Sequence, residues 1–235
     1  MIGNIIPIPR LSEYDYIFPD PRYASKDGLV AFGGDLNPNR VLEAYKRGIF
    51  PWYSEGDPIL WWSPDPRFIL YLDKLKISRS LKKVLKKEIF EIRVDTNFYE
   101  VIKNCQTIKR KDQDGTWILP EIVDVFTILH ERGFAHSIEV YQDGELVGGL
   151  YGLSLGSAFF GESMFSKVSN ASKVAFVNLV KICKNFDFDF IDCQIPSEHL
   201  RRMGAEEIER VRFLDELELS LKKPSKIRKW SSYVS

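Results

Sequence analysis

Two carboxylates and one amide stand out in the sequence because they interrupt apolar, strand-like segments. Glu162 follows Phe159, Phe160 and Gly161, and Asp192 lies two residues before Gln194 in a second apolar stretch. A buried carboxylate is costly unless it is paired or serves a site. Since side chains alternate along a strand, we expect Asp192 and Gln194 to share one face.

If Glu162 lies on a neighbouring strand, three hydrogen-bond acceptors converge beside the apolar side chains of Leu150, Phe159 and Met164. Such a site suits a cationic or amine-bearing substrate that carries a large apolar group. A plainer interpretation stays open at this point, in which Asp192 caps the following turn and Glu162 pairs with an arginine.

Several other chemistries are not expected. The three histidines, His130, His136 and His199, form no H-E-x-x-H motif and no C-x-x-C pair is present, so we expect no metal site. No P-loop and no G-x-S-x-G motif occurs. The glycines from Gly148 to Gly156 are not followed by a helix start, which favours strand and turn positions over a phosphate-binding loop.

Composition points to an ordinary globular protein, with 44% hydrophobic and 28% charged residues in 235. Three cysteines without a close pair are typical of reduced thiols, and the first residues lack the basic segment and apolar core of a signal peptide. We therefore expect a cytoplasmic protein. The 33 basic and 33 acidic residues balance, so a polyanionic partner would have to bind a local patch.

The elements that must position these residues alternate between helix and strand. Asp143-Gly144 between apolar segments predicts a hairpin within an antiparallel meander. Strands are expected at residues 90–94, 136–141, 146–153, 157–162 and 188–193. Helices are expected at residues 37–48, 78–87 and 170–182, with Asn37, Ser78 and Asn170 as their N-caps, and at residues 122–133 and 197–204. Tyr45 is expected on the apolar face of the first of these helices. This pattern predicts an α+β fold, with a small N-terminal domain at residues 1–66 and a larger domain at residues 67–235.

Two further features allow more than one interpretation. The expected helix 78–87 carries lysines opposite its apolar face, which indicates either a phosphate-binding surface or an ordinary solvated face. The aromatics Trp52, Tyr53, Trp61 and Trp62 lie in segments that look irregular. They could form a stacking platform, the wall of an apolar pocket or the core of a small domain.

At this point the sequence becomes specific, because several long motifs resemble the leucyl/phenylalanyl-tRNA–protein transferases in order and spacing from residue 28 to residue 194. The N-terminal motifs are Gly28-Leu29-Val30-Ala31-Phe32-Gly33-Gly34-Asp35-Leu36, Gly48-Ile49-Phe50-Pro51-Trp52 and Trp61-Trp62-Ser63-Pro64-Asp65-Pro66-Arg67. The later motifs are Ala135-His136-Ser137-Ile138-Glu139, Leu146-Val147-Gly148-Gly149-Leu150-Tyr151-Gly152, Gly161-Glu162-Ser163-Met164-Phe165-Ser166, Ala171-Ser172-Lys173 and Ile191-Asp192-Cys193-Gln194.

The resemblance implies an aminoacyltransferase of the bacterial N-end rule pathway. Such an enzyme moves Leu or Phe, and Met less well, from aminoacyl-tRNA to the N-terminal Arg or Lys of an acceptor protein. It also implies an N-acetyltransferase-like larger domain with a mixed, largely antiparallel sheet flanked by helices. We expect no cofactor, no metal, no membrane and a monomer. No ATP is needed, because the aminoacyl ester is already activated.

Carried over residue by residue, Asp192 and Gln194 match the family's catalytic pair and Glu162 its active-site glutamate. Gln194 is too weak a base to deprotonate an amine, but it can accept a hydrogen bond from the amine and aim it at the ester. Asp192 can polarise that amide or stabilise the positive charge that develops on nitrogen. Two alternatives stay open: the terminal ribose hydroxyl relays the proton, or Glu162 binds the acceptor's basic side chain or the donor's amine.

The resemblance also supplies the binding residues. The donor's side chain is expected in a pocket lined by Trp52, Leu150, Phe159 and Met164, and Ile191 is expected to bind substrate. Trp117 is a further expected substrate-binding residue, and Trp52 can also stack on the terminal adenine. The phosphates of the tRNA acceptor stem are expected on the lysines of the helix 78–87. These lysines are Lys82, Lys83, Lys86 and Lys87.

One departure from the family pattern is Phe126, where a tyrosine is usual. If that hydroxyl contacts substrate, the contact is missing here. Two other functions remain to be weighed. One is aminoacyl transfer from tRNA to another acceptor, such as a cell-wall peptide, and the other is a non-catalytic RNA-binding module that uses Lys82, Lys83 and Trp61.

Overall fold

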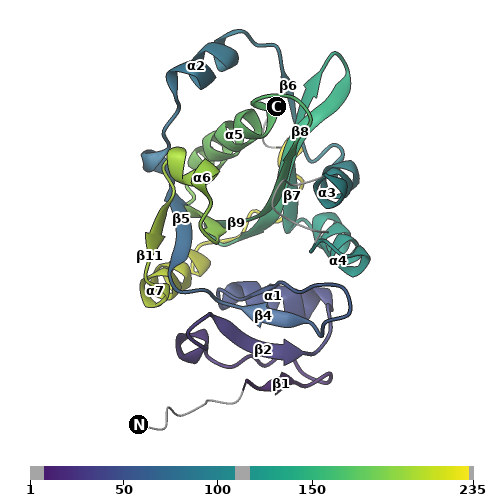
Figure 1. Ribbon diagram of the computed structural model, residues 1–235, viewed down its shortest axis with the longest axis vertical. Helices are drawn as coiled ribbons and strands as arrows, with labels where there is room; N and C mark the ends of the chain where they lie inside the picture. The colour runs from purple at the N-terminus through teal and green to yellow at the C-terminus, as the bar shows by residue number, and fades with distance from the viewer. Residues whose placement is uncertain (1–7, 109–116, 233–235) are drawn as a thin grey trace.

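The computed structural model describes residues 8–108 and 117–232, which form two sheets. The small sheet has the order β1-β2-β4-β3 and lies at the N-terminal end of the molecule (Figure 1). Its strands are Arg10–Leu11 (β1), Leu29–Gly33 (β2), Phe50–Pro51 (β3) and Leu60–Trp62 (β4). A 3₁₀ turn (η1, Pro21–Tyr23) and the helix α1 (Pro38–Lys46) connect them.

Of the aromatics that looked irregular in sequence, Trp61 and Trp62 lie in β4, and Trp52 and Tyr53 directly follow β3. Side-chain hydrogen bonds fix these segments. The fully buried Trp61 donates its indole N–H to the Gly33 carbonyl at 2.9 Å, and Trp62 donates to the Trp52 carbonyl at 2.7 Å. Trp61 is therefore a core residue of the small sheet. Neither a stacking surface nor an RNA contact is available at this side chain in the folded protein.

The large sheet has seven strands in the order β11-β5-β10-β9-β8-β7-β6, and β10 runs parallel to β9 while the other neighbours are antiparallel. The strands are Arg67–Tyr71 (β5), Glu91–Val94 (β6), Ala135–Gln142 (β7), Glu145–Leu155 (β8), Ala158–Ser166 (β9), Phe190–Gln194 (β10) and Glu206–Ile208 (β11). The predicted meander is β7-β8-β9. The predicted α+β fold with a mixed, largely antiparallel sheet is confirmed.

Helices cover both faces of this sheet (Figure 1). They are Arg79–Lys86 (α2), Phe98–Thr107 (α3), Pro120–Glu131 (α4), Ala171–Asn185 (α5), Glu198–Arg202 (α6) and Arg210–Leu221 (α7), with 3₁₀ turns at Leu72–Lys74 (η2) and Trp230–Ser232 (η3). One apolar cluster joins α5 to one face of the sheet. A second joins α3, α4 and α7 to the other face and continues into α1 and the small sheet. Among the described residues, every helix is too short or too polar to cross a membrane.

Several local predictions hold and one does not. Asn37 caps α1, accepting the backbone N–H of Asn39 at 2.9 Å, and Ser78 caps α2 by accepting that of Leu81 at 3.2 Å. Asn170 precedes α5 as predicted, but it is left-handed (φ 70°) and its side chain does not cap the helix. The backbone itself makes the turn from β9 into α5.

The glycines of β8 are strand positions, as predicted, and they permit close packing. A Cβ on Gly152 would lie 2.2 Å from the Phe160 carbonyl oxygen, and one on Gly148 would lie 2.5 Å from the Cβ of Ala171. The absence of side chains at these positions lets β9 and the start of α5 approach β8.

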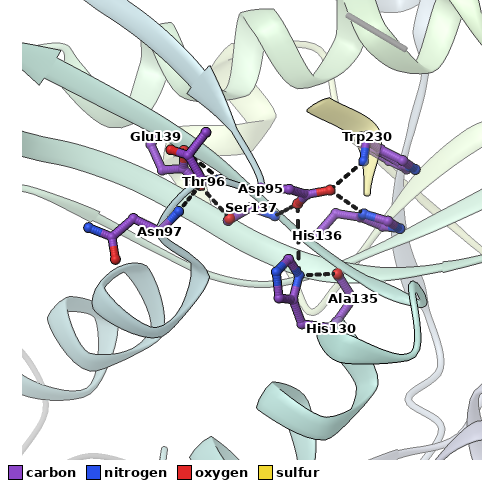
Figure 2. A network of polar contacts seen from close by, with 9 residues as sticks. All are labelled: Asp95, Thr96, Asn97, His130, Ala135, His136, Ser137, Glu139 and Trp230. Carbon is purple, nitrogen blue, oxygen red and sulfur yellow. Dashed lines mark hydrogen bonds and ion pairs between the residues drawn. The ribbon is translucent and has the colours of Figure 1, made fainter. Parts of the chain in front are cut away.

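The Ala135–Glu139 motif is structural (Figure 2). Buried Asp95 accepts hydrogen bonds from the Trp230 backbone N–H at 2.6 Å and the Ser137 N–H at 2.8 Å, and its Oδ2 lies 2.8 Å from His136 Nδ1. The Trp230 ring stacks on His136 with centroids 4.0 Å apart. This network fastens the C-terminal segment to the large sheet.

Candidate active site

The centre of the site is a contact between the middle of β9 and the end of β10. Gln194 donates from Nε2 to Glu162 Oε1 at 2.9 Å, and the buried Tyr45 of α1 donates its hydroxyl to the same oxygen at 2.7 Å. The parallel pairing of β9 and β10 brings Glu162 and Gln194 together although they lie 32 residues apart. Both hydrogen bonds fall on Oε1, so the orientation of the carboxyl group is fixed.

A β-bulge sets the position of Gln194. The register of β10 against β5 shifts between Asp192 and Gln194, and Gln194 is left-handed with φ 63°. Its backbone N–H donates to Asp192 Oδ1 at 2.9 Å. A non-glycine residue with positive φ is unfavourable unless its surroundings hold it there. The Asp192 carboxylate supplies one such restraint.

Asp192 itself is held by Arg67 in a buried ion pair. Arg67 Nε and Nη2 lie 2.9 Å and 2.6 Å from the two carboxylate oxygens, and the side chains are 1% and 0% exposed. The guanidinium is flanked by the rings of Phe50 and Phe213, with centroids 4.9 Å and 4.4 Å away. Of the alternatives left open from the sequence, it is therefore Asp192, and not Glu162, that pairs with an arginine.

The environment of Glu162 favours its neutral form. Burial raises the pKa of Glu162 from 4.5 to about 8, with a contribution from the nearby Asp192 charge. The hydrogen bonds from Tyr45 and Gln194, and the charge of Arg67, act in the opposite direction without cancelling the rise. Near neutral pH much of Glu162 is therefore a carboxylic acid that can both donate and accept.

Two cavities meet at Glu162. The larger, of about 330 Å³, is mainly apolar and lined by Leu150, Met164, Ile191 and two residues of α5. The smaller, of about 150 Å³, is lined by Trp52, Trp117 and Gln194, among others. Glu162, Cys193 and Ile195 border both. Burial and the nearby Asp192 raise the pKa of the Cys193 thiol, so it stays protonated and is a poor nucleophile.

The structure separates the side chains that were expected in one pocket. Leu150 and Met164 line the larger cavity, whereas Trp52 lines the smaller one. Of the other expected substrate-binding residues, Ile191 lines the larger cavity and Trp117 the smaller. Phe159 is fully buried and packs on Trp230, with ring centroids 5.6 Å apart, so it lies in the core behind the site. Asp192 is not among the residues that line these two cavities, and it contacts the site through the backbone N–H of Gln194.

Comparison with known proteins identifies the family. The model of the leucyl/phenylalanyl-tRNA protein transferase family matches residues 69–218, and that of the family's N-terminal domain matches residues 34–65. The chain belongs to this family. Leucyl/phenylalanyl-tRNA–protein transferases from Sulfurimonas denitrificans and Myxococcus xanthus are 56% and 54% identical to it. The first alignment covers 89% of this chain and 91% of the relative, and the second covers 96% and 97%.

Solved structures similar to this transferase include L-PGS from Bacillus licheniformis, at 13% identity and a TM-score of 0.40, covering 68% of this chain and 51% of that one. Another is a ribosomal-protein-alanine N-acetyltransferase from Brucella melitensis, at 15% identity and a TM-score of 0.33, covering 46% and 82%. The transferase has the predicted arrangement of a small N-terminal sheet followed by a larger, mixed sheet with helices.

The remaining predicted residues of the transferase lie on α2, where one face is solvated. Leu81 is buried in the apolar cluster that contains α5, while the four lysines are exposed. They are Lys82, Lys83, Lys86 and Lys87. Among the described residues, none of these lysines makes an ion pair, which leaves their charges available. In contrast, Phe126 is fully buried between Tyr45 and Tyr151 and lines neither cavity.

Two residues of the transferase site were missed by reading the sequence. Tyr45 was assigned to the apolar face of its helix, and only the fold shows that its hydroxyl reaches Glu162. Arg67 was part of a recognised motif but had no assigned partner. A signal was present for Arg67, since an arginine that opens an apolar strand must find hydrogen-bond partners if it is buried. Among the described residues, no cluster of His, Cys, Asp and Glu could hold a metal ion.

Proposed function

We propose that the chain transfers Leu or Phe, and Met less well, from aminoacyl-tRNA to the N-terminal Arg or Lys of acceptor proteins, marking them for degradation by the N-end rule. The observation that carries this proposal is the Glu162–Gln194 contact at the junction of two cavities. A polar pair at such a junction can face an ester held between an apolar side chain on one side and a nucleoside on the other.

The larger cavity takes the donor's side chain. Its lining by Leu150, Met164 and Ile191 suits an unbranched-at-Cβ apolar group such as Leu or Phe. The smaller cavity, with the aromatic faces of Trp52 and Trp117, takes the terminal adenosine, since purines stack on aromatic rings. The lysines of α2 contact phosphates of the acceptor stem without reading sequence.

Gln194 aims the incoming amine. Its Nε2 is committed to Glu162, so its Oε1 is the atom that accepts an N–H from the acceptor's α-amino group. That amine has an ordinary pKa of about 7.7–8.0 and is already partly neutral, so positioning is the main requirement. Asp192 acts as a positioning residue, because its carboxylate holds the backbone N–H of Gln194 and is itself held by Arg67.

In the reaction the amine nitrogen bonds to the ester carbon, the bond to the ribose oxygen breaks, and the amine's proton moves to that oxygen. Two routes for the proton are compatible with the site. Glu162, protonated near neutral pH, can give a proton to the ribose oxygen and recover one from the amine. The neighbouring ribose hydroxyl can relay it instead. A donor lacking that hydroxyl distinguishes them, because only the ribose route requires it.

A transfer assay tests the proposal. Labelled Leu-tRNA is mixed with a protein that begins with Arg and, as the matched control, with the same protein beginning with Met. Label in acid-precipitable protein with the Arg acceptor alone supports the proposal. Binding of tRNA without transfer supports a non-catalytic RNA-binding module, and transfer to a cell-wall peptide supports the other acceptor class. The domain division between residues 66 and 67, a cytoplasmic location and a monomeric state stay predictions.

A further inference from the structure

The strand β9 loses one of its two neighbours part-way along its length. Its parallel pairing with β10 ends at Phe160, opposite Asp192, although β9 itself continues beyond this point. β10 does not follow, because Gln194 is left-handed and the next N–H, that of Ile195, turns back to the Cys193 carbonyl at 2.8 Å. The two strands therefore diverge, and among the described residues the far part of β9 pairs with β8 alone.

The open edge of β9 borders the larger cavity. Residues 161–164 line this cavity and are only partly buried, whereas residues 158–160 of the same strand are fully buried. From β10 and the segment that follows it, Ile191, Cys193 and Ile195 line the cavity as well. The larger cavity therefore occupies the opening between the diverging strands.

The register of β9 against β8 identifies the backbone groups at this open edge. The Lys167 N–H donates to the Val147 carbonyl at 2.7 Å, so Lys167 faces β8. In an antiparallel pair, successive residues direct their backbone groups alternately toward and away from the partner strand. The register is unbroken as far as Ser163, so Phe165 also faces β8, and Met164 directs its N–H and carbonyl oxygen to the open edge.

A carbonyl oxygen at this place suits a charged amine. Met164 follows Glu162 by two residues and so lies about 7 Å further along the strand. In an ester that reacts beside Glu162 with its side chain in the larger cavity, the donor's α-amino group lies at the mouth of that cavity. Glu162 is a poorer partner for an ammonium group, because its Oε1 already accepts from Tyr45 and Gln194 and burial raises its pKa to about 8.

We propose that the Met164 carbonyl oxygen binds the free α-amino group of the donor amino acid and so limits donors to aminoacyl esters whose amine is not acylated. The inference rests on the proposed function, because it takes the ester to lie between the two cavities. An ammonium group donates a charge-assisted hydrogen bond, whereas an acylated amine has lost its charge. The two amines of the reaction then have separate oxygen acceptors, Met164 O for the donor and Gln194 Oε1 for the acceptor.

The test compares two unreactive amide analogues as inhibitors of transfer from Leu-tRNA, 3′-deoxy-3′-leucylamino-adenosine and its 4-methylpentanoyl counterpart, which lacks only the α-amine. For wild type, the Ki of the amine-bearing analogue should be about tenfold lower. Replacing Phe165 by its α-hydroxy acid turns the Met164 carbonyl into that of an ester, a weaker acceptor, and the preference should fall to about threefold or less. The same exchange at Lys167 also removes an N–H that faces β8 but leaves the Met164 carbonyl intact, so it should keep the wild-type ratio.

A second measurement needs no variant: wild type should transfer from N-acetyl-Leu-tRNA at least about tenfold more slowly than from Leu-tRNA. Equal use of the two donors, an unchanged Ki ratio in the Phe165 variant or an equal fall in the Lys167 variant overturns the assignment while transfer from Leu-tRNA continues. A preference that disappears in Glu162→Gln instead assigns the amine to that carboxyl group and also overturns it. Absence of transfer from Leu-tRNA by wild type overturns the proposed function itself, so the two failures are distinguishable.

Discussion

Breaking the Arg67–Asp192 pair should show how the fold supports the site. Arg67→Met keeps an apolar stem between Phe50 and Phe213 but leaves the Asp192 carboxylate buried without its cation. Exposed ion pairs contribute about 0–1 kcal/mol, whereas removing one partner of a buried pair costs about 3–5 kcal/mol. With side chains 1% and 0% exposed, the larger range applies. We therefore expect urea unfolding to report a loss of about 3–5 kcal/mol.

A double variant separates stability from turnover. Arg67→Met with Asp192→Leu buries no unpaired charge, so much of the lost stability should return. Turnover should stay low, because the Gln194 backbone N–H has lost its acceptor and the bulge its restraint. Arg212→Met is the matched control, since the Arg212–Glu216 pair has an arginine that is 60% exposed and its loss should cost under about 1 kcal/mol.

Two measurements check this reasoning: urea unfolding, and the single-turnover transfer rate from Leu-tRNA under conditions where each variant is folded. If Arg67→Met were as mild as Arg212→Met, the carboxylate would not depend on its cation. If the double variant transferred leucine at the wild-type rate, Asp192 would have no positioning role. Either result would refute the argument.

The remaining predictions concern the pH response, the donor cavity and the tRNA surface. Because the pKa of Glu162 is about 8 when folded and 4.5 otherwise, the folded state retains a proton that the unfolded state releases in this window. Stability should therefore fall as pH rises from about 5 to 8, by up to about 1.4 kcal/mol per pH unit from this group. Urea unfolding should show a flatter dependence in Glu162→Gln, and an unchanged slope would contradict the assignment. Met164→Ala enlarges the larger cavity and should favour Phe over Leu, with changes of about 1–3 kcal/mol per methylene in competing-donor assays. An unaltered ratio would place the donor's side chain elsewhere. Lys82→Glu with Lys86→Glu should weaken tRNA binding and reduce its salt dependence by a slope of about 1 per lost phosphate contact. If filter binding gave the wild-type slope, α2 would not be the tRNA surface.

Local signals predicted much of the frame that holds the site. The Asp143-Gly144 turn and the alternation around it predicted β7 and β8, and the caps at Asn37 and Ser78 predicted α1 and α2. The carboxylates of Glu162 and Asp192 stood out because their neighbours are apolar. Each of these signals lies within a few residues of the feature it predicts.

The partners of those carboxylates could not be predicted in the same way. Arg67 lies 125 residues from Asp192, and Tyr45 lies 117 residues from Glu162. Only the pairing of β5 with β10, and the packing of α1 beneath the large sheet, brings them together. The division of the pocket in two, with Trp52 on one side and Met164 on the other, likewise depends on where Gln194 turns at the bulge.

The most direct test of the account is the single-turnover rate of leucine transfer to an Arg-starting peptide by Gln194→Ala, measured beside the Kd of Leu-tRNA. If Gln194 aims the amine, the rate should fall about 100-fold or more while the Kd stays near the wild-type value. A rate within a few fold of wild type, or a Kd that weakens in proportion to the rate, would contradict the account.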